Sequence, residues 1–306
     1  MFNHSNFTMT KNDHYSSKAG HNIDRYKYFT YNETVVLINC SLNVPLMVIG
    51  IAGNSLVLLA IYTTPSLRST ASVLFLGSLA VSDLLVGLVV QPVYVASGFV
   101  RNHFLDSVSS VLSFATCGTS LLSITAVSVD RFLALHYHMR YPTLVTCQRA
   151  KLVLAVLWLA IFLLSGIYFW NVLAYFLLIS IGVSLCLIIS IGSYTRIYRI
   201  VQHQRRKIIH QRQAVSLQTI DAPNMFFLKK SAFNSFLFFI VMVIFYLPMC
   251  LSMSLYVTTK KWEPAWSLAT TAVFMNSSVN PFLYCWRLKE LRTAVSKIIK
   301  KMYCKK

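Results

Sequence analysis

The sequence predicts an all-α membrane protein, a seven-transmembrane helix bundle with a short amphipathic surface helix at its C-terminal end. Of the 306 residues, 56% are hydrophobic and only 12% are charged, whereas soluble domains have roughly 25% charged residues. A helix needs ~20 apolar residues to cross a bilayer. Seven apolar runs of about that length or longer occur, over residues 35–62, 71–96, 105–135, 152–170, 172–195, 231–257 and 265–286.

The cationic residues between these runs orient the chain. Alternate loops, together with the segment after the seventh run, contain 21 Lys and Arg residues, and the other side of the membrane has the remaining seven. Cytoplasmic loops carry an excess of such residues. We therefore expect a multi-pass plasma-membrane protein with its N-terminus outside the cell and its C-terminus in the cytoplasm. This distribution explains the net charge of +19 better than nucleic-acid binding does.

The first segment, residues 1–34, is polar and is expected to be an extracellular tail. Asn3, Asn6 and Asn32 each begin an Asn-x-Ser/Thr sequon, the acceptor of N-glycosylation. Single sequons also arise by chance, but three in a short tail favour a glycosylated one. The membrane domain then covers residues 35–286.

The fourth and fifth runs are joined by very little chain. No charged residue occurs between Lys151 and Arg196, and these 44 residues make about 66 Å of helix, enough for two spans and little else. We predict a short extracellular turn near Trp170 and Asn171. The polar segment 196–230 can extend the fifth helix into the cytoplasm as far as Pro223, which ends a helix.

The last segment, residues 287–306, has apolar residues at every third or fourth position with lysines between them, the pattern of a helix lying on a membrane surface. Cys304, in this basic context, is a candidate for palmitoylation, and an unmodified surface cysteine fits almost as well.

Several runs contain polar or helix-bending residues in fixed patterns. Asn54 lies in the first run and Asp83 in the second, Asp130 and Arg131 end the third, and Trp158 is centred in the fourth. The sixth contains Phe-Tyr-Leu-Pro over 245–248, and the seventh contains Asn-Pro-Phe-Leu-Tyr over 280–284.

Together these motifs resemble those of the rhodopsin-like (class A) G-protein-coupled receptors. The resemblance implies a receptor that converts extracellular ligand binding into activation of a heterotrimeric G protein. It also implies a set of coupling and switch residues: Asp130, Arg131, Tyr194, Tyr246, Pro248, Asn280, Pro281 and Tyr284. Pro248 and Pro281 each remove a backbone hydrogen bond and bend a helix, as movable sixth and seventh helices require.

Asp83 is the one carboxylate deep in an apolar run, where a charge costs at least ~2.5–3.5 kcal/mol unless it is partnered. Asn54, Ser120, Asn276 and Asn280 are its expected partners, and this set resembles the family's sodium pocket. The alternative is a protonated Asp83 in a hydrogen-bond network without an ion. No obligatory cofactor is expected.

The ligand is less well determined. Amine receptors of the family have an Asp where this chain has Ser113, and opsins have a Lys where it has Phe274, so a peptide or a lipid-like small molecule is favoured. Asp106 replaces the family's disulfide cysteine and Cys186 replaces a proline, which gives a partial resemblance to melanocortin, cannabinoid, lysophospholipid and adenosine receptors. The expected ligand pocket consists of Gln91, Tyr94, Asp106, Ser110, Ser113, Cys117, Tyr246 and Phe274.

Two other classes of protein were weighed. A transporter commonly shows internal repeats with broken helices in matching halves, and this chain shows no such duplication. An enzyme needs an acid–base or nucleophile cluster, and no His, Lys or Glu lies deep in any run. We expect a receptor and no enzymatic activity, with a membrane transporter as the alternative.

Overall fold

The computed structural model describes residues 33–100, 102–137, 140–214, 240–252, 255 and 263–303. Regular structure within these residues is helical, and no strand occurs among them. The elements are α2 (Glu33–Thr63), α3 (Pro65–Arg68), α4 (Ala71–Leu85), the π-helix η1 (Val86–Val90), α5 (Gln91–Val100), α6 (His103–Tyr137), α7 (Tyr141–Leu144), α8 (Cys147–Ser165), α9 (Ile167–Trp170), α10 (Val172–Ala214), the helix Ile240–Ser252, α12 (Glu263–Arg287) and α13 (Lys289–Tyr303).

The predicted seven-helix bundle is confirmed. Five helical segments are long and apolar enough to cross a membrane: Glu33–Thr63, Ala71–Val100, His103–Tyr137, Cys147–Trp170 and Val172–Gln204. They correspond to the first five apolar runs. The described part of the sixth run forms the apolar helix Ile240–Ser252. The seventh run forms α12, whose 25 residues make about 37 Å of helix.

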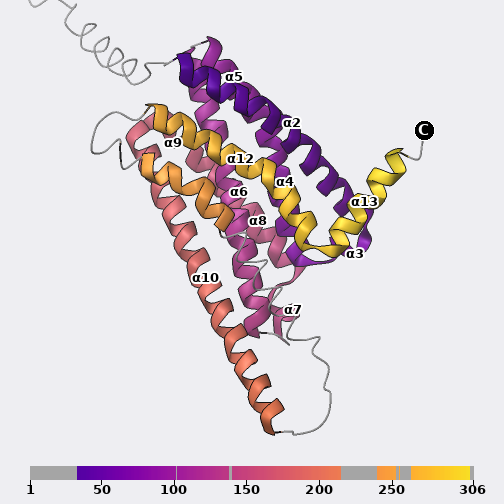
Figure 1. Cartoon of the computed structure of the whole chain (residues 1–306). Helices are drawn as coiled ribbons and strands as arrows, with labels where there is room; N and C mark the ends of the chain where they lie inside the picture. The colour runs from indigo at the N-terminus through magenta and orange to yellow at the C-terminus, as the bar shows by residue number, and fades with distance from the viewer. Residues whose placement is uncertain are drawn as a thin grey trace, which may run out of the picture.

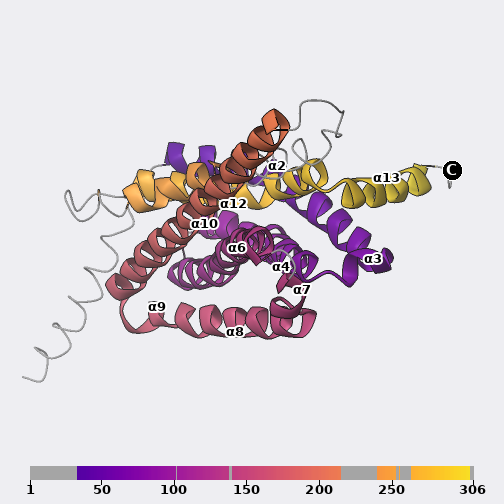
Figure 2. The same ribbon diagram turned by 90° about the horizontal axis from the view of Figure 1, so that it is seen from below.

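The third span, α6, occupies the middle of the bundle (Figure 2). It packs against α4, α8 and α10, while α2 packs against α4 and α12. One end of the bundle carries α9 and the last turn of α5, and the opposite end carries α3, α7 and α13 (Figure 1). These are called below the α9 end and the α7 end.

The first and last spans approach each other closely. A Cβ atom built on Gly53 of α2 would lie 2.8 Å from Cγ of Pro281 in α12, well inside the ~3.5–4.0 Å of a favourable carbon–carbon contact. Nearer the α9 end the same two helices are joined by side chains, because Asn43 Nδ2 donates to Thr271 Oγ1 at 3.0 Å. Thr271 Oγ1 in turn donates to Asn39 Oδ1 at 2.9 Å. Asn39 is buried at this contact.

The second span contains a wide π turn that the sequence analysis did not foresee. Residues Val86–Val90 form η1, and Pro92 follows two residues later. A proline ring inside a helix clashes with the carbonyl four residues earlier and leaves it without a donor, and a π turn relieves such a clash by widening the helix locally. Gly87 lies within the same π turn. A larger residue would be crowded there, because a Cβ would lie 2.9 Å from Cγ1 of Ile51 in α2.

The short connection between the fourth and fifth spans is confirmed. Helix α9 ends at Trp170, Asn171 alone is extended (φ −148°, ψ 108°), and α10 begins at Val172. The Asn171 side chain accepts the backbone N–H of Ala174 at 3.0 Å, which caps the new helix. From there α10 continues for 43 residues to Ala214, as its polar extension predicted.

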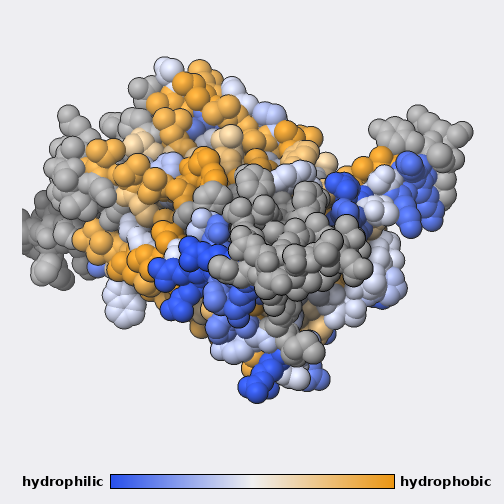
Figure 3. Space-filling view, turned by 60° about the horizontal axis from the view of Figure 1, so that its bottom comes forward, coloured by the Kyte–Doolittle hydropathy of each residue, from blue (hydrophilic) through white to orange (hydrophobic). Residues whose placement is uncertain are grey.

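The predicted amphipathic helix is α13, which projects sideways from the bundle (Figure 1). Leu291 and Ala294 pack into the core, while Lys297, Lys300 and Lys301 are exposed. Figure 3 shows apolar residues over much of the bundle surface and hydrophilic ones on α13 and on the face turned to the viewer. The predicted modification sites at Asn3, Asn6, Asn32 and Cys304 lie outside the described residues.

Candidate functional site

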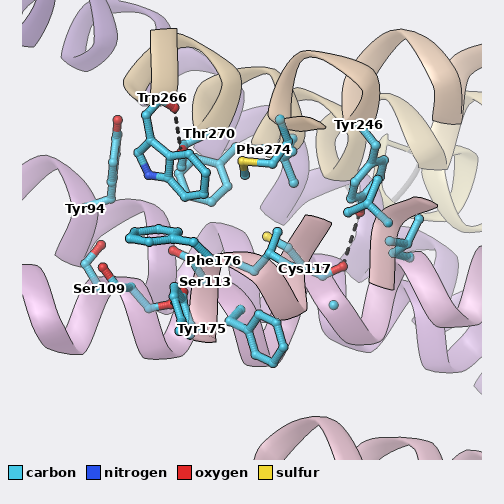
Figure 4. Close-up of a pocket in the computed structure, with 18 of the residues that line it drawn as sticks. Tyr94, Ser109, Ser113, Cys117, Tyr175, Phe176, Tyr246, Trp266, Thr270 and Phe274 are labelled. Atoms are coloured by element: carbon cyan, nitrogen blue, oxygen red, sulfur yellow. Dashed lines mark hydrogen bonds between the residues drawn. The ribbon is translucent and has the colours of Figure 1, made fainter. Parts of the chain in front are cut away.

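A cavity of about 420 Å³ lies inside the bundle towards the α9 end, a size typical of small-molecule sites. It begins near Asp106, in the first turn of α6, and reaches Tyr246 in the helix Ile240–Ser252. Figure 4 shows that side chains from α6, α10 and α12 point towards one another across it.

Aromatic rings form much of the cavity wall. Trp266 of α12 meets Phe176 of α10 edge to face, with 4.7 Å between ring centroids. Tyr94 of α5 and Phe274 of α12 make a second such pair at 5.2 Å. Edge-to-face pairs contribute about 0.5–1.5 kcal/mol beyond their burial, so the rings hold α5, α10 and α12 around the cavity.

Tyr246 connects the cavity to the helix that contains Pro248. The Tyr246 side chain is only 3% exposed, and its hydroxyl donates to the Cys117 carbonyl oxygen of α6 at 3.2 Å (Figure 4). One turn after Pro248, the Ser252 hydroxyl lies 2.8 Å from the Pro248 carbonyl oxygen and 3.0 Å from that of Ala265 at the start of α12. A molecule in the cavity would therefore touch a residue that joins the third span to the sixth.

Seven of the eight predicted pocket residues line this cavity: Tyr94, Asp106, Ser110, Ser113, Cys117, Tyr246 and Phe274. Gln91 does not, and that expectation was wrong. Its amide donates to Asn43 Oδ1 at 3.1 Å, and the side chain is 1% exposed between α5 and α2. The π turn just before Gln91 rotates the following residues about the helix axis, which turns this side chain towards α2.

Other residues that line the cavity were not predicted from the sequence, among them Asn39, Ser109, Phe176, Trp266 and Thr270. Trp266 and Phe176 are aromatic residues near the ends of spans, where belts of Trp and Tyr at the membrane interface are ordinary. Only the packing of α10 against α12 shows that they face each other. No pattern in the sequence gives that pairing.

A second polar centre surrounds Asp83 in the middle of the bundle. Its carboxylate accepts the Ser120 hydroxyl at 2.8 Å and the Asn280 amide at 2.8 Å, so it joins α4 to α6 and α12. Asn276 is fully buried one turn before Asn280, and its side-chain N and O have no hydrogen-bond partner among the described residues. Oδ1 of Asn54 likewise has no hydrogen-bond partner among the described residues, although Nδ2 of the same side chain donates to the Ser277 carbonyl oxygen at 3.0 Å.

A third centre lies at the α7 end, around Asp130. This carboxylate is 2% exposed and accepts two short hydrogen bonds, from Ser72 at 2.7 Å and from the Tyr141 hydroxyl at 2.6 Å. The neighbouring Arg131 is more distant, with its Nε 3.7 Å from Asp130. Burial, and the adjacent Asp130 carboxylate, raise the pKa of Tyr141 to about 12, so its hydroxyl remains a donor at neutral pH.

Two further predicted switch residues lie on the long helices α10 and α12. The Tyr194 hydroxyl of α10 lies 2.7 Å from the Ser128 hydroxyl of α6, one of the contacts between these two helices. Tyr284 of α12 is fully buried in the main core.

Comparisons with known proteins point to one family. The model of the rhodopsin family of seven-transmembrane receptors matches residues 53–173. The chain is 27% identical over 301 residues to a chicken protein named adenosine receptor A2b, an alignment that covers 84% of this chain and 87% of that one. It is 34% identical over 132 residues to the human adenosine receptor A2b (42% and 40% covered), and 33% identical over 118 residues to an octopamine receptor of Lymnaea stagnalis (37% and 18% covered). These matches and the seven-helix bundle support a rhodopsin-like (class A) G-protein-coupled receptor.

The receptor is therefore a multi-pass membrane protein, from a family whose members have an extracellular ligand and a G protein as partners. This is a family of receptors rather than of enzymes. The partial resemblance to adenosine receptors is confirmed by these relatives. The resemblance to melanocortin, cannabinoid and lysophospholipid receptors stays an interpretation of Asp106 and Cys186.

Within the receptor, the three centres lie along α6, with Cys117 at the cavity, Ser120 at the Asp83 centre and Asp130 at its end. Thirteen residues separate Cys117 from Asp130, which corresponds to about 20 Å of helix. The receptor thus has a continuous helix that touches the cavity, the buried carboxylate and the α7 end.

Proposed function

We propose that this receptor binds an extracellular small molecule, largely apolar and without negative charge, in the cavity at the α9 end. Binding would then activate a heterotrimeric G protein at the α7 end. The observation that carries the proposal is the position of Tyr246, which lines the cavity and bonds to α6. A ligand that displaced this hydroxyl would free the sixth span to move about Pro248, and a ligand acts by its different affinity for two such states.

The character of the lining supports the choice of ligand. Among the described residues that line the cavity, Asp106 is the only charged one. Among these described residues an anionic ligand would find no Lys, Arg or His, and a carboxylate in a site of low dielectric would repel it. A large polar peptide would also lose much of its hydration in so apolar a site.

The charge distribution supports the orientation. Arg68, Arg140, Arg149 and Lys151 are exposed at the α7 end, where the positive-inside rule places the cytoplasm. In this orientation Asp130 and Arg131 meet the G protein, and the tail before α2 lies outside the cell. An antibody against an N-terminal tag should stain intact cells. Staining that requires permeabilised cells would contradict the orientation.

We also propose a sodium ion at the Asp83 centre. Sodium prefers oxygen ligands, and the carboxylate of Asp83, the hydroxyl of Ser120 and the amide oxygens of Asn54, Asn276 and Asn280 lie in this part of the core. Buried amide oxygens without a partner, as in Asn54 and Asn276, normally belong to an ion or a water molecule. Bound there, the ion would offset the cost of burying the Asp83 charge.

A ligand screen with cyclic-AMP and calcium readouts tests the function. Adenosine and octopamine, the ligands in the names of the relatives, belong in its first round beside uncharged and cationic lipids. The variant Ser113→Phe fills the cavity, and Ala155→Phe, at an exposed position on α8, is its matched control. An agonist should lose at least about tenfold in potency on Ser113→Phe, ~1.4 kcal/mol, and keep its potency on Ala155→Phe. Equal potency on both would place the ligand outside the cavity.

A further inference from the structure

The cavity has a second arm that runs away from Asp106, between α6, α8 and α10. Its wall is apolar and includes Leu122, Ile161, Leu164, Gly182, Leu185 and Ile189, which we call the apolar arm. Leu185 and Ile189 are 53% and 47% exposed while they also line the cavity. Since both lie within a membrane-spanning helix, the apolar arm reaches the lipid-facing surface of the bundle.

Two glycines shape the arm. A Cβ built on Gly182 of α10 would meet no atom within 4 Å, so the space beside it is open. A Cβ on Gly118 of α6 would lie 3.3 Å from Cγ2 of Ile161, so α6 and α8 are close at this level. Gly182, Leu185 and Ile189 follow one another at helical spacing and form one stripe of α10. The open space therefore lies beside this stripe of α10.

The opposite arm of the same cavity is polar. Tyr94, Asp106, Ser109, Ser110 and Ser113 line it from α5 and α6, near the α9 end. Hydroxyl groups and one carboxylate suit a head group that donates and accepts hydrogen bonds. The cavity thus joins a polar compartment to an apolar channel that opens at the depth of the acyl chains.

We propose that the ligand is a single-chain lipid with an amine- and hydroxyl-bearing head. The head lies among Asp106 and the serines, and the hydrocarbon chain extends along the apolar arm towards the bilayer between α8 and α10. This inference rests on the proposed function of the cavity as the ligand site. A chain that is already in lipid gains little by entering an apolar channel, because both surroundings are equally dry. The arm therefore adds little affinity of its own, but it accommodates a long chain and provides a lateral path into the site, so a side chain that fills the arm should exclude long-chain ligands.

The test uses the whole receptor in lipid nanodiscs, with a radiolabelled long-chain amino alcohol as the probe. A short-chain homologue with the same head and a fatty acid of the same chain length are the comparison ligands. Gly182→Phe fills the open space of the apolar arm. Gly192→Phe is the matched control, since Gly192 lies on the same helix, a Cβ there would also meet nothing within 4 Å, and it does not line the cavity.

The wild-type receptor and Gly192→Phe should bind the long-chain probe saturably, and Gly182→Phe should bind it at least about tenfold more weakly, ~1.4 kcal/mol. The short-chain homologue should bind Gly182→Phe and the wild type alike, which also shows that the variant is folded. The fatty acid should not compete with the probe. Absence of saturable probe binding to the wild type, equal binding of the long chain by both glycine variants, or preferred binding of the fatty acid would each overturn the proposal.

Failure of this proposal is distinguishable from failure of the proposed function. If agonists from the screen lose potency on Ser113→Phe, but no agonist loses potency on Gly182→Phe or with a change in chain length, the cavity remains the ligand site and the lipid assignment is wrong. If Ser113→Phe changes the potency of no agonist, the cavity itself is not the ligand site.

Discussion

The contact between Gly53 and Pro281 gives a sharp prediction about stability. In Gly53→Ala the new methyl carbon would lie 2.8 Å from Cγ and 2.9 Å from Cβ of the proline ring. A carbon–carbon contact is favourable at ~3.5–4.0 Å, so α2 and α12 have to separate by nearly 1 Å. A proline ring cannot rotate out of the way, and overpacking of this kind typically costs about 1–3 kcal/mol.

Gly77→Ala is the matched control, because there the nearest atom would be Cδ1 of Ile61 at 3.9 Å. Alanine is favoured over glycine inside a helix by about 0.5–1 kcal/mol, so this variant should melt at or slightly above the wild-type temperature. Gly53→Ala should melt about 2–12 °C lower, at roughly 2–4 °C per kcal/mol for a chain of this size.

Thermal unfolding can be followed with a dye that fluoresces on reacting with thiols, because Cys117 and Cys186 are buried free cysteines. The melts are run in detergent at one heating rate, because unfolding of such proteins is often irreversible. Equal melting temperatures for the two alanine variants would refute the close packing of α2 against α12. A lower temperature for Gly77→Ala alone would refute it as well.

Three further predictions concern the polar centres. Arg131→Ala should abolish agonist-stimulated nucleotide exchange on the G protein while ligand binding and surface expression persist, and normal exchange would remove Arg131 from coupling. Raising sodium should lower agonist affinity for the wild type but not for Asp83→Asn; a wild type that is indifferent to sodium would favour a protonated Asp83. Tyr141→Phe removes a hydrogen bond to a buried carboxylate and should lower the free energy of unfolding by at most about 1.5–3 kcal/mol. The pKa of Tyr141 is raised to about 12, so this contribution is complete below about pH 10 and is lost as the pH rises through the folded-state value; an effect that changed between about pH 7 and about pH 9 would contradict it.

Much of the fold was predictable because the bilayer restricts a chain so strongly. The uncharged stretch between Lys151 and Arg196 was enough to place the turn at Asn171, since a span has a nearly fixed length. The partners Ser120 and Asn280 of Asp83 were also predictable, because a buried carboxylate requires donors and few are present in the neighbouring runs.

What could not be predicted depends on how each helix is rotated about its axis. Gln91 was assigned to the cavity as though the second span had one uniform period, but the π turn before it directs the amide to Asn43. Pro92 is visible in the sequence, yet a proline can equally produce a simple kink. The pairing of Trp266 with Phe176 depends on the distance between two helices far apart in sequence, and neither residue carries a signal for the other.

The uninterrupted course of α10 has a mechanical consequence. Where many members of the family have a proline, this helix has the buried Cys186, and its 43 residues make a rod about 65 Å long, more than twice the ~30 Å thickness of the hydrocarbon core. Without a hinge, the rod cannot absorb a movement at one end by bending at its middle. A tilt of about 5° at the cavity therefore displaces its far end by about 6 Å over that length. The fifth span of this receptor is thus built as a rigid lever whose basic end extends beyond the membrane, so that a small tilt where Phe176 lines the cavity becomes a larger displacement of that end.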